Sequence, residues 1–119
     1  IALLFTVALT ITGCYYDKED LLYGTENCNT TTAPTYSADV SAIMSAHCAV
    51  GGCHNASAAA SGIILDNYAG VKTQVDNGKL IGVVTHTGGF IPMPRGAAKL
   101  SDCNIAKIQS WVNAGAPNN

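Results

Sequence analysis

The scarcity of large apolar side chains limits what this chain can fold into. Hydrophobic residues occupy 48% of its 119 positions, but 17 of them are Ala. From Cys14 onward only 23 residues are Val, Ile, Leu, Met, Phe or Trp, and seven more lie in the first 13 positions. One small domain with so few large side chains buries its surface poorly, so we expect it to need disulfides, a metal or another added core. The five cysteines are therefore the first residues to consider.

The charge pattern argues against a nucleic-acid partner. Eight acidic residues face six basic ones, charged residues make up 12% of the chain, and no run of Lys or Arg is present. A nucleic-acid-binding protein is expected to carry a basic patch or stripe. The sequence also holds no recognisable Ser-His-Asp set, pair of carboxylates or Gly-rich phosphate loop. We therefore predict a protein that binds no nucleic acid and is not an enzyme.

The first residues are typical of an export signal. Residues 1–12 are uncharged and apolar apart from three threonines, a run too short to span a bilayer. The next step, Ile11-Thr12-Gly13-Cys14, resembles the bacterial lipobox, in which an aliphatic residue and two small ones precede a lipidated cysteine. We expect a signal-peptide hydrophobic region at 1–13 and a lipid anchor at Cys14. The alternative is an apolar segment followed by an ordinary cysteine.

Helical patterns dominate the rest of the chain. Residues 14–35 are expected to form a lipid-anchored linker, and residues 36–119 one folded domain. We expect helices capped by Ser37, by Asp66 or Asn67, and by Ser101, while 79–85 is helical or extended. The inward faces are predicted to be Val40, Ile43, Met44 and His47; Tyr68, Val71 and Val75; and Ile105, Ile108, Trp111 and Val112. No hairpin signal appears, so the predicted class is all-α with long loops.

The heptapeptide Cys48-Ala49-Val50-Gly51-Gly52-Cys53-His54 carries the clearest chemistry. Two thiols followed at once by an imidazole suit covalent haem attachment, in which the thiols bond the vinyl groups and the histidine reaches the iron. The usual spacing has two residues between the cysteines, and here there are four, so Gly51-Gly52 is expected to supply freedom for a bulge. A Cys48–Cys53 disulfide, a zinc site and reactive thiols are the alternatives.

A methionine between two prolines is the candidate for the sixth iron ligand. Met93 lies 39 residues after His54, in the segment Ile91-Pro92-Met93-Pro94. Soft thioether sulfur on haem iron raises the reduction potential, and the prolines would hold the loop stiffly. The alternative for the same position is His86, which would give a lower potential.

Taken together, these motifs resemble a class I c-type cytochrome domain over about residues 36–117. The resemblance is closest to single-haem lipoprotein cytochromes of Bacteroidetes-like and Planctomycete-like bacteria, which share "Tyr-Ala-Gly-Val-Lys", "Met-Pro" and "Trp-Val-Asn-Ala-Gly-Ala-Pro" with this chain. It implies three to four short helices around one covalent haem c. Cys48 and Cys53 would form the thioethers, and His54 and Met93 would bind the iron. It also implies that the first and last helices cross.

With lipid and haem assigned, Cys28 and Cys103 remain, and we expect them to form a disulfide in an exported protein. The predicted function is electron transfer at the bacterial cell envelope, on the periplasmic face or the outer surface. Its partners would be redox proteins, the membrane through the lipid anchor, and other cytochromes in an assembly. Two alternatives stay open: a disulfide-stabilised structural or surface-assembly lipoprotein, and a haem sensor or enzyme with an open sixth site.

Overall fold

The computed structural model describes Cys28 and residues 32–119. The expected signal region, Cys14 and most of the linker lie outside the described residues. In the part that is described, the chain forms four α-helices, a π-helical turn and a 3₁₀ turn, and no β-strand, in agreement with the predicted all-α class. In chain order the elements are η1 (Tyr36–Val40), α2 (Ser41–His47), η2 (Ala60–Gly62), α3 (Tyr68–Asp76), α4 (Lys79–Thr85) and α5 (Asp102–Asn113).

The first helical segment begins two residues earlier than expected. Thr35 is its N-cap, and its hydroxyl oxygen accepts a hydrogen bond from the Ala38 N–H at 3.2 Å. The Thr35 N–H in turn donates to the Asp39 carboxylate at 3.0 Å, so cap and first turn bind each other reciprocally. The prediction that Ser37 caps this helix was therefore wrong, because Thr35 and Ser37 are both good caps and the reciprocal bond to Asp39 favours Thr35.

The other two predicted caps are confirmed. The Asn67 side chain accepts a hydrogen bond from the Gly70 N–H at 2.9 Å at the start of α3. The Ser101 hydroxyl accepts from the Asn104 N–H at 3.2 Å at the start of α5. Gly78 lies between α3 and α4 with a φ of +73°, a left-handed conformation that glycine adopts without a steric cost. The segment 79–85, which the sequence left open, is the helix α4.

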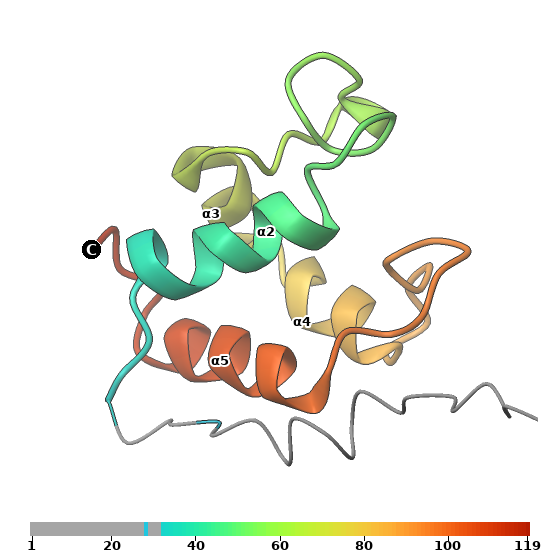
Figure 1. Ribbon diagram of the computed structural model, residues 1–119. Coiled ribbons are helices and arrows are strands. Elements are labelled where there is room, and N and C mark those ends of the chain that lie inside the picture. The colour runs from blue at the N-terminus through green and yellow to red at the C-terminus, as the bar shows by residue number, and fades with distance from the viewer. Residues whose placement is uncertain (1–27, 29–31) are drawn as a thin grey trace, which may run out of the picture.

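The core joins the two ends of the folded domain. The π-helical turn η1 packs on α5, and in Figure 1 the continuous helix η1–α2 lies above α5, with α4 to the right. Tyr36 and Trp111 bring ring centroids within 5.8 Å, and Lys107 forms a 3.5 Å ion pair with Asp39. The core consists of twelve buried hydrophobic residues: Val40, Ile43, Met44, Leu65, Val71, Leu80, Val84, Leu100, Ile105, Ile108, Trp111 and Ala116. His47, expected on the inward face, is exposed.

The C-terminal residues close over the aromatic part of this core. The Tyr68 hydroxyl donates to the Ala116 carbonyl, and the Trp111 indole N–H donates to the Pro117 carbonyl, both at 2.9 Å. Asn119 accepts a backbone hydrogen bond from Ser37 at 2.8 Å. The end of the domain is thus bonded back to its beginning.

Two long connections project from the same side of the helical body in Figure 1. One runs from the end of α2 to α3 and carries the Cys-His segment, and the other runs from α4 to α5 and carries Met93.

Cys28 and Cys103 lie at disulfide distance, with Cα atoms 5.3 Å apart, so position 28 is joined to the first turn of α5. None of the helices over the described range is long and apolar enough to span a bilayer.

Candidate functional site

The segment 48–54 folds into a closed turn at the end of α2. Cys48 is the C-cap of that helix, and its N–H donates to the Met44 carbonyl at 2.9 Å. The His54 N–H donates a hydrogen bond to the Cys48 carbonyl at 3.1 Å. The chain therefore leaves α2 at Cys48 and comes back beside it at His54. Within it, Gly52 has a φ of +79°, which agrees with the prediction that glycine allows the chain to bulge between the cysteines.

Cys48 and Cys53 are both unpaired and both half-buried. Burial, and secondly the charge of the Cys53 thiolate, raises the pKa of the Cys48 thiol to about 11. A raised pKa leaves Cys48 almost fully protonated at neutral pH, whereas redox-active and catalytic cysteines have lowered pKa values.

The ring of His54 is oriented by a backbone carbonyl. Its Nδ1 lies 3.3 Å from the Ile63 oxygen, and because a carbonyl can only accept, Nδ1 must carry the proton. The lone pair of the neutral ring is then on Nε2. Histidines that bind metals are commonly held in this way, with one nitrogen donating to a carbonyl or carboxylate and the other free for the metal.

The loop that supplies this carbonyl is itself bonded to the Cys-His turn. The Leu65 N–H donates to the His54 carbonyl at 2.7 Å, and the Ala60 N–H donates to the Cys53 carbonyl at 2.9 Å. Farther along, Gly70 packs against the Ile64 carbonyl so closely that a Cβ at this position would collide with it. Helix α3 therefore supports the segment that orients His54.

Met93 lies in the second long connection and is held against α4. Its N–H donates to the Val83 carbonyl at 2.9 Å, and its own carbonyl lies 3.0 Å from Nε2 of His86. The Met93 side chain is half-buried, whereas His86 is exposed.

The structure thus brings Cys48, Cys53 and His54 together, and separately brings Met93 and His86 together. No hydrogen bond among the described residues joins the two groups. No cluster of three or more His, Cys, Asp or Glu side chains that could hold a bare metal ion occurs in the described part of the chain. A site built from these residues would have to span the two connections with a larger group.

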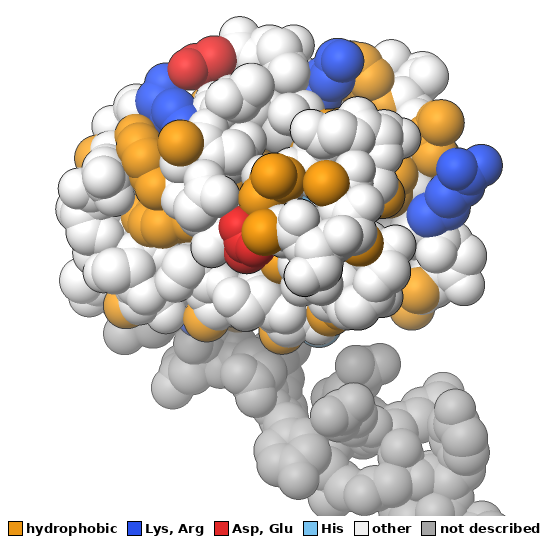
Figure 2. Space-filling model, turned by 90° about the horizontal axis from the view of Figure 1, so that it is seen from above, with side chains coloured by type: hydrophobic (Ala, Val, Ile, Leu, Met, Phe, Trp, Pro, Cys, Tyr) orange, Lys and Arg blue, Asp and Glu red, His pale blue; other side chains and the backbone are white. Residues whose placement is uncertain are grey.

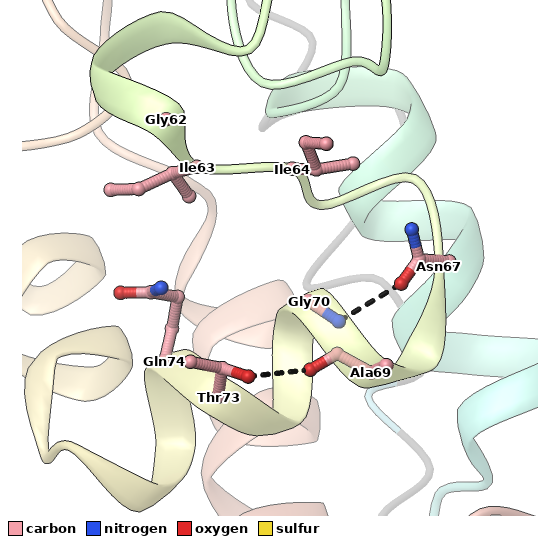
Figure 3. Close-up of a pocket in the computed structure, with 8 residues that line it drawn as sticks. All are labelled: Gly62, Ile63, Ile64, Asn67, Ala69, Gly70, Thr73 and Gln74. Atoms are coloured by element: carbon pink, nitrogen blue, oxygen red, sulfur yellow. Dashed lines mark hydrogen bonds between the residues drawn. The ribbon is translucent and has the colours of Figure 1, made fainter.

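A surface pocket of about 300 Å³ lies beside the Cys-His turn but does not include it. Segment 62–64 forms one wall and α3 the other (Figure 3), and the lining residues are Gly62, Ile63, Ile64, Asn67, Ala69, Gly70, Thr73 and Gln74. Its polar side chains are already used locally, since Asn67 caps α3, Thr73 donates to the Ala69 carbonyl and Gln74 accepts from Asn77.

The exposed large apolar side chains lie in the same two connections. Ile91 is 57% exposed and Phe90 39%, both close in sequence to Met93, while Val50 in the Cys-His turn is 37% exposed. On the face shown in Figure 2, the basic side chains stand apart from one another and apolar side chains are scattered between them. Arg95 and Lys99 are exposed on the Met93 connection.

Sequence reasoning missed two partners of the candidate ligands. The acceptor for His54 is a main-chain oxygen of Ile63, nine residues away, and every residue has such an oxygen, so no sequence signal could have found it. His86 was considered only as a competing ligand, although its ring bonds the backbone of Met93.

Comparison with known proteins finds no matching family, no matching curated protein and no matching solved structure.

Proposed function

We propose that this protein is a single-haem c-type cytochrome that carries electrons at the bacterial cell envelope. The observation that carries the proposal is the oriented His54, which directly follows Cys53 and bonds back to the Cys48 backbone, while both cysteines are unpaired. A haem c bound there would supply reversible one-electron exchange between ferrous and ferric iron. The protein's own residues would attach it, supply both axial ligands and limit the access of water.

The division of the cysteines supports attachment at Cys48 and Cys53. Cys28 and Cys103 lie at disulfide distance, and this pair stands apart from the two unpaired thiols. Both of these thiols are unpaired, so their sulfurs are available to form thioether bonds to carbon. A zinc site would need further nitrogen or sulfur ligands, and no such cluster lies among the described side chains.

The hydrogen bond of His54 supports its role as the proximal ligand. With Nδ1–H donating to the Ile63 carbonyl, Nε2 presents its lone pair, and the same bond increases the electron density that the ring can donate. The carbonyl is held in place by the turns of 53–65 and by α3.

Met93 suits the distal position. Its backbone is bonded on both sides, it is flanked by prolines that restrict the chain, and its side chain is half-buried and not packed into the core. Thioether ligation would favour the ferrous state and give a comparatively high potential.

The exposed apolar side chains support contact with redox partners. Phe90, Ile91 and Val50 lie on the two connections that would border the haem. Transient electron-transfer complexes are small and depend on a few apolar contacts near the redox centre. The lipid anchor at Cys14, in the region outside the described residues, would restrict this carrier to the membrane surface, where redox proteins and other cytochromes would be its partners.

The test is production in bacteria that also express a cytochrome c maturation system, followed by intact-mass and visible spectroscopy. We expect a mass gain of one haem that survives acid–acetone extraction, and a weak ferric band at about 695 nm from sulfur ligation. The double variant C48A/C53A should lose the covalent haem. The variant C28S/C103S removes the same number of cysteines and, although its fold is less stable, should keep the covalent haem because Cys48 and Cys53 are intact.

Other results would favour the alternatives. A wild-type protein without covalent haem would refute the proposal and leave a disulfide-stabilised structural lipoprotein. Covalent haem with a high-spin ferric spectrum would instead indicate an open sixth site, as in a haem sensor or enzyme.

A further inference from the structure

The geometry points to His86 as a positioning residue for Met93, one that clamps the backbone of this candidate ligand without binding the iron itself. The inference rests on the proposed function, because it concerns how the thioether is delivered to a haem. It separates His86 from the role of competing ligand that the sequence allowed.

The first support is the direct bond between the two residues. Nε2 of His86 lies 3.0 Å from the Met93 carbonyl oxygen, and since the oxygen can only accept, Nε2–H donates. This nitrogen is the more accessible one of a histidine ring and the one that most often reaches a metal. In the observed arrangement it is occupied.

The second support is that the bond completes a grip on both sides of Met93. The Met93 N–H donates to the Val83 carbonyl of α4 at 2.9 Å, so without His86 only one side of the residue would be held. With both bonds made, the Cα of Met93 is fixed relative to α4. Only the side-chain torsions remain free to bring the sulfur to its target.

The third support is the way α4 ends. His86 is the C-cap of this helix and has a left-handed conformation, with φ 60° and ψ 40°, which turns the chain sharply and sends it back toward the helix. The Thr87 N–H donates to the Gly82 carbonyl at 2.9 Å, and the Phe90 ring covers Gly82 where a larger residue would collide with it. His86 therefore lies where the loop after α4 begins, and its side chain bonds the Met93 backbone farther along the same loop.

A rigid loop matters because a thioether is a neutral, weak ligand. A freely moving loop would have to lose its conformational freedom each time sulfur bound the iron, and this cost would weaken the bond. A clamp formed in advance removes part of that cost. One hydrogen bond of ordinary net strength corresponds to about a fivefold change in the equilibrium between bound and released thioether.

The test measures how easily an external ligand displaces the sulfur in the haem-loaded protein. Imidazole is titrated into the ferric protein, and loss of the band at about 695 nm gives its apparent Kd. The variants are H86L, which lacks the donor, and H86Q, whose amide nitrogen can replace Nε2. Both side chains face the same left-handed backbone, so backbone strain is matched. Intact mass reports covalent haem for each variant.

We expect the apparent Kd for imidazole to be about fivefold lower in H86L than in the wild type, and H86Q to lie within about twofold of the wild type. All three proteins should carry covalent haem. Equal values for H86L and the wild type would overturn the inference, as would an H86Q that behaves like H86L.

Two further results would distinguish a failure of this inference from a failure of the proposed function. Covalent haem without a sulfur band in the wild type, with a change of spectrum in H86L, would overturn the inference by making His86 the ligand, while the cytochrome proposal would stand. Absence of covalent haem from the wild type would refute the proposed function itself, and the inference with it.

Discussion

Replacing Cys28 and Cys103 by Ser should strongly destabilise the folded domain. The two residues are 75 positions apart, so their link closes one loop that contains every helix before α5. In the chain-entropy model, a loop of this length stabilises the native state by about 4.5 kcal/mol, because it restricts the unfolded chain. The double variant C28S/C103S is expected to lose a free energy of unfolding of that size.

Strain or lost contacts in the folded protein should change this loss of unfolding free energy little. The Cα atoms are 5.3 Å apart, within the ordinary range for a disulfide, so the link requires no backbone displacement. Cys103 is half-buried at the beginning of α5, where Ser is readily accommodated. The measured loss should therefore reflect the unfolded chain.

Urea unfolding followed by circular dichroism at about 222 nm gives the magnitude. A small domain has a slope of about 1–2 kcal/mol per molar urea, so the midpoint should fall by about 2–4.5 M. The single variants C28S and C103S should fall equally far, because either one breaks the link, and so should the wild type reduced with dithiothreitol. If the double variant is unfolded without urea, an osmolyte such as trimethylamine oxide restores a measurable transition. A midpoint that moves by less than about 0.5 M would refute the reasoning.

Three smaller perturbations probe the site and its support. Gly70→Ala should cost about 2 kcal/mol of unfolding free energy in urea denaturation, because its Cβ would collide with the Ile64 carbonyl. Tyr68→Phe should cost about 1 kcal/mol in the same assay, because it removes the hydroxyl that bonds the Ala116 carbonyl. In protein made without haem, a Cys48 pKa of about 11 means that alkylation at pH 8 should be about 100-fold slower than for a thiol of ordinary pKa, and should rise about tenfold per pH unit toward pH 11. Peptide mass spectrometry measures that rate.

Each of these predictions has a result that would contradict it, and Gly70→Ala also has a matched control variant. Gly51→Ala faces open space and should leave the urea midpoint unchanged, and an equal effect at Gly70 and Gly51 would contradict the steric argument. For Tyr68→Phe, an unchanged unfolding free energy would mean that water replaces the lost bond at no cost. For Cys48, alkylation as fast as that of a short cysteine peptide at pH 8 would show that burial does not protect the thiol.

Much of the helical structure could be predicted from local sequence. The caps Asn67 and Ser101 act within their own first turns, and the buried residues of α5 follow a helical repeat, so both signals are contained in a few neighbouring positions. The proximity of Cys53 and His54 to Cys48 likewise follows from a short spacing. The short run 79–85 could not be assigned, because so brief an apolar segment suits a helix or a strand equally well.

The sequence by itself therefore determined α3 and α5 with their caps and apolar faces, and the types of residue present at 48–54 and at 93. Only the tertiary structure decided which groups hold those residues. The Ile63 carbonyl orients His54, and the Met93 carbonyl receives His86. Both acceptors are main-chain oxygens, which are chemically the same in every residue. Which oxygen meets which side chain depends on how the loops fold back on the helices, and the spacing of residue types does not encode that directly.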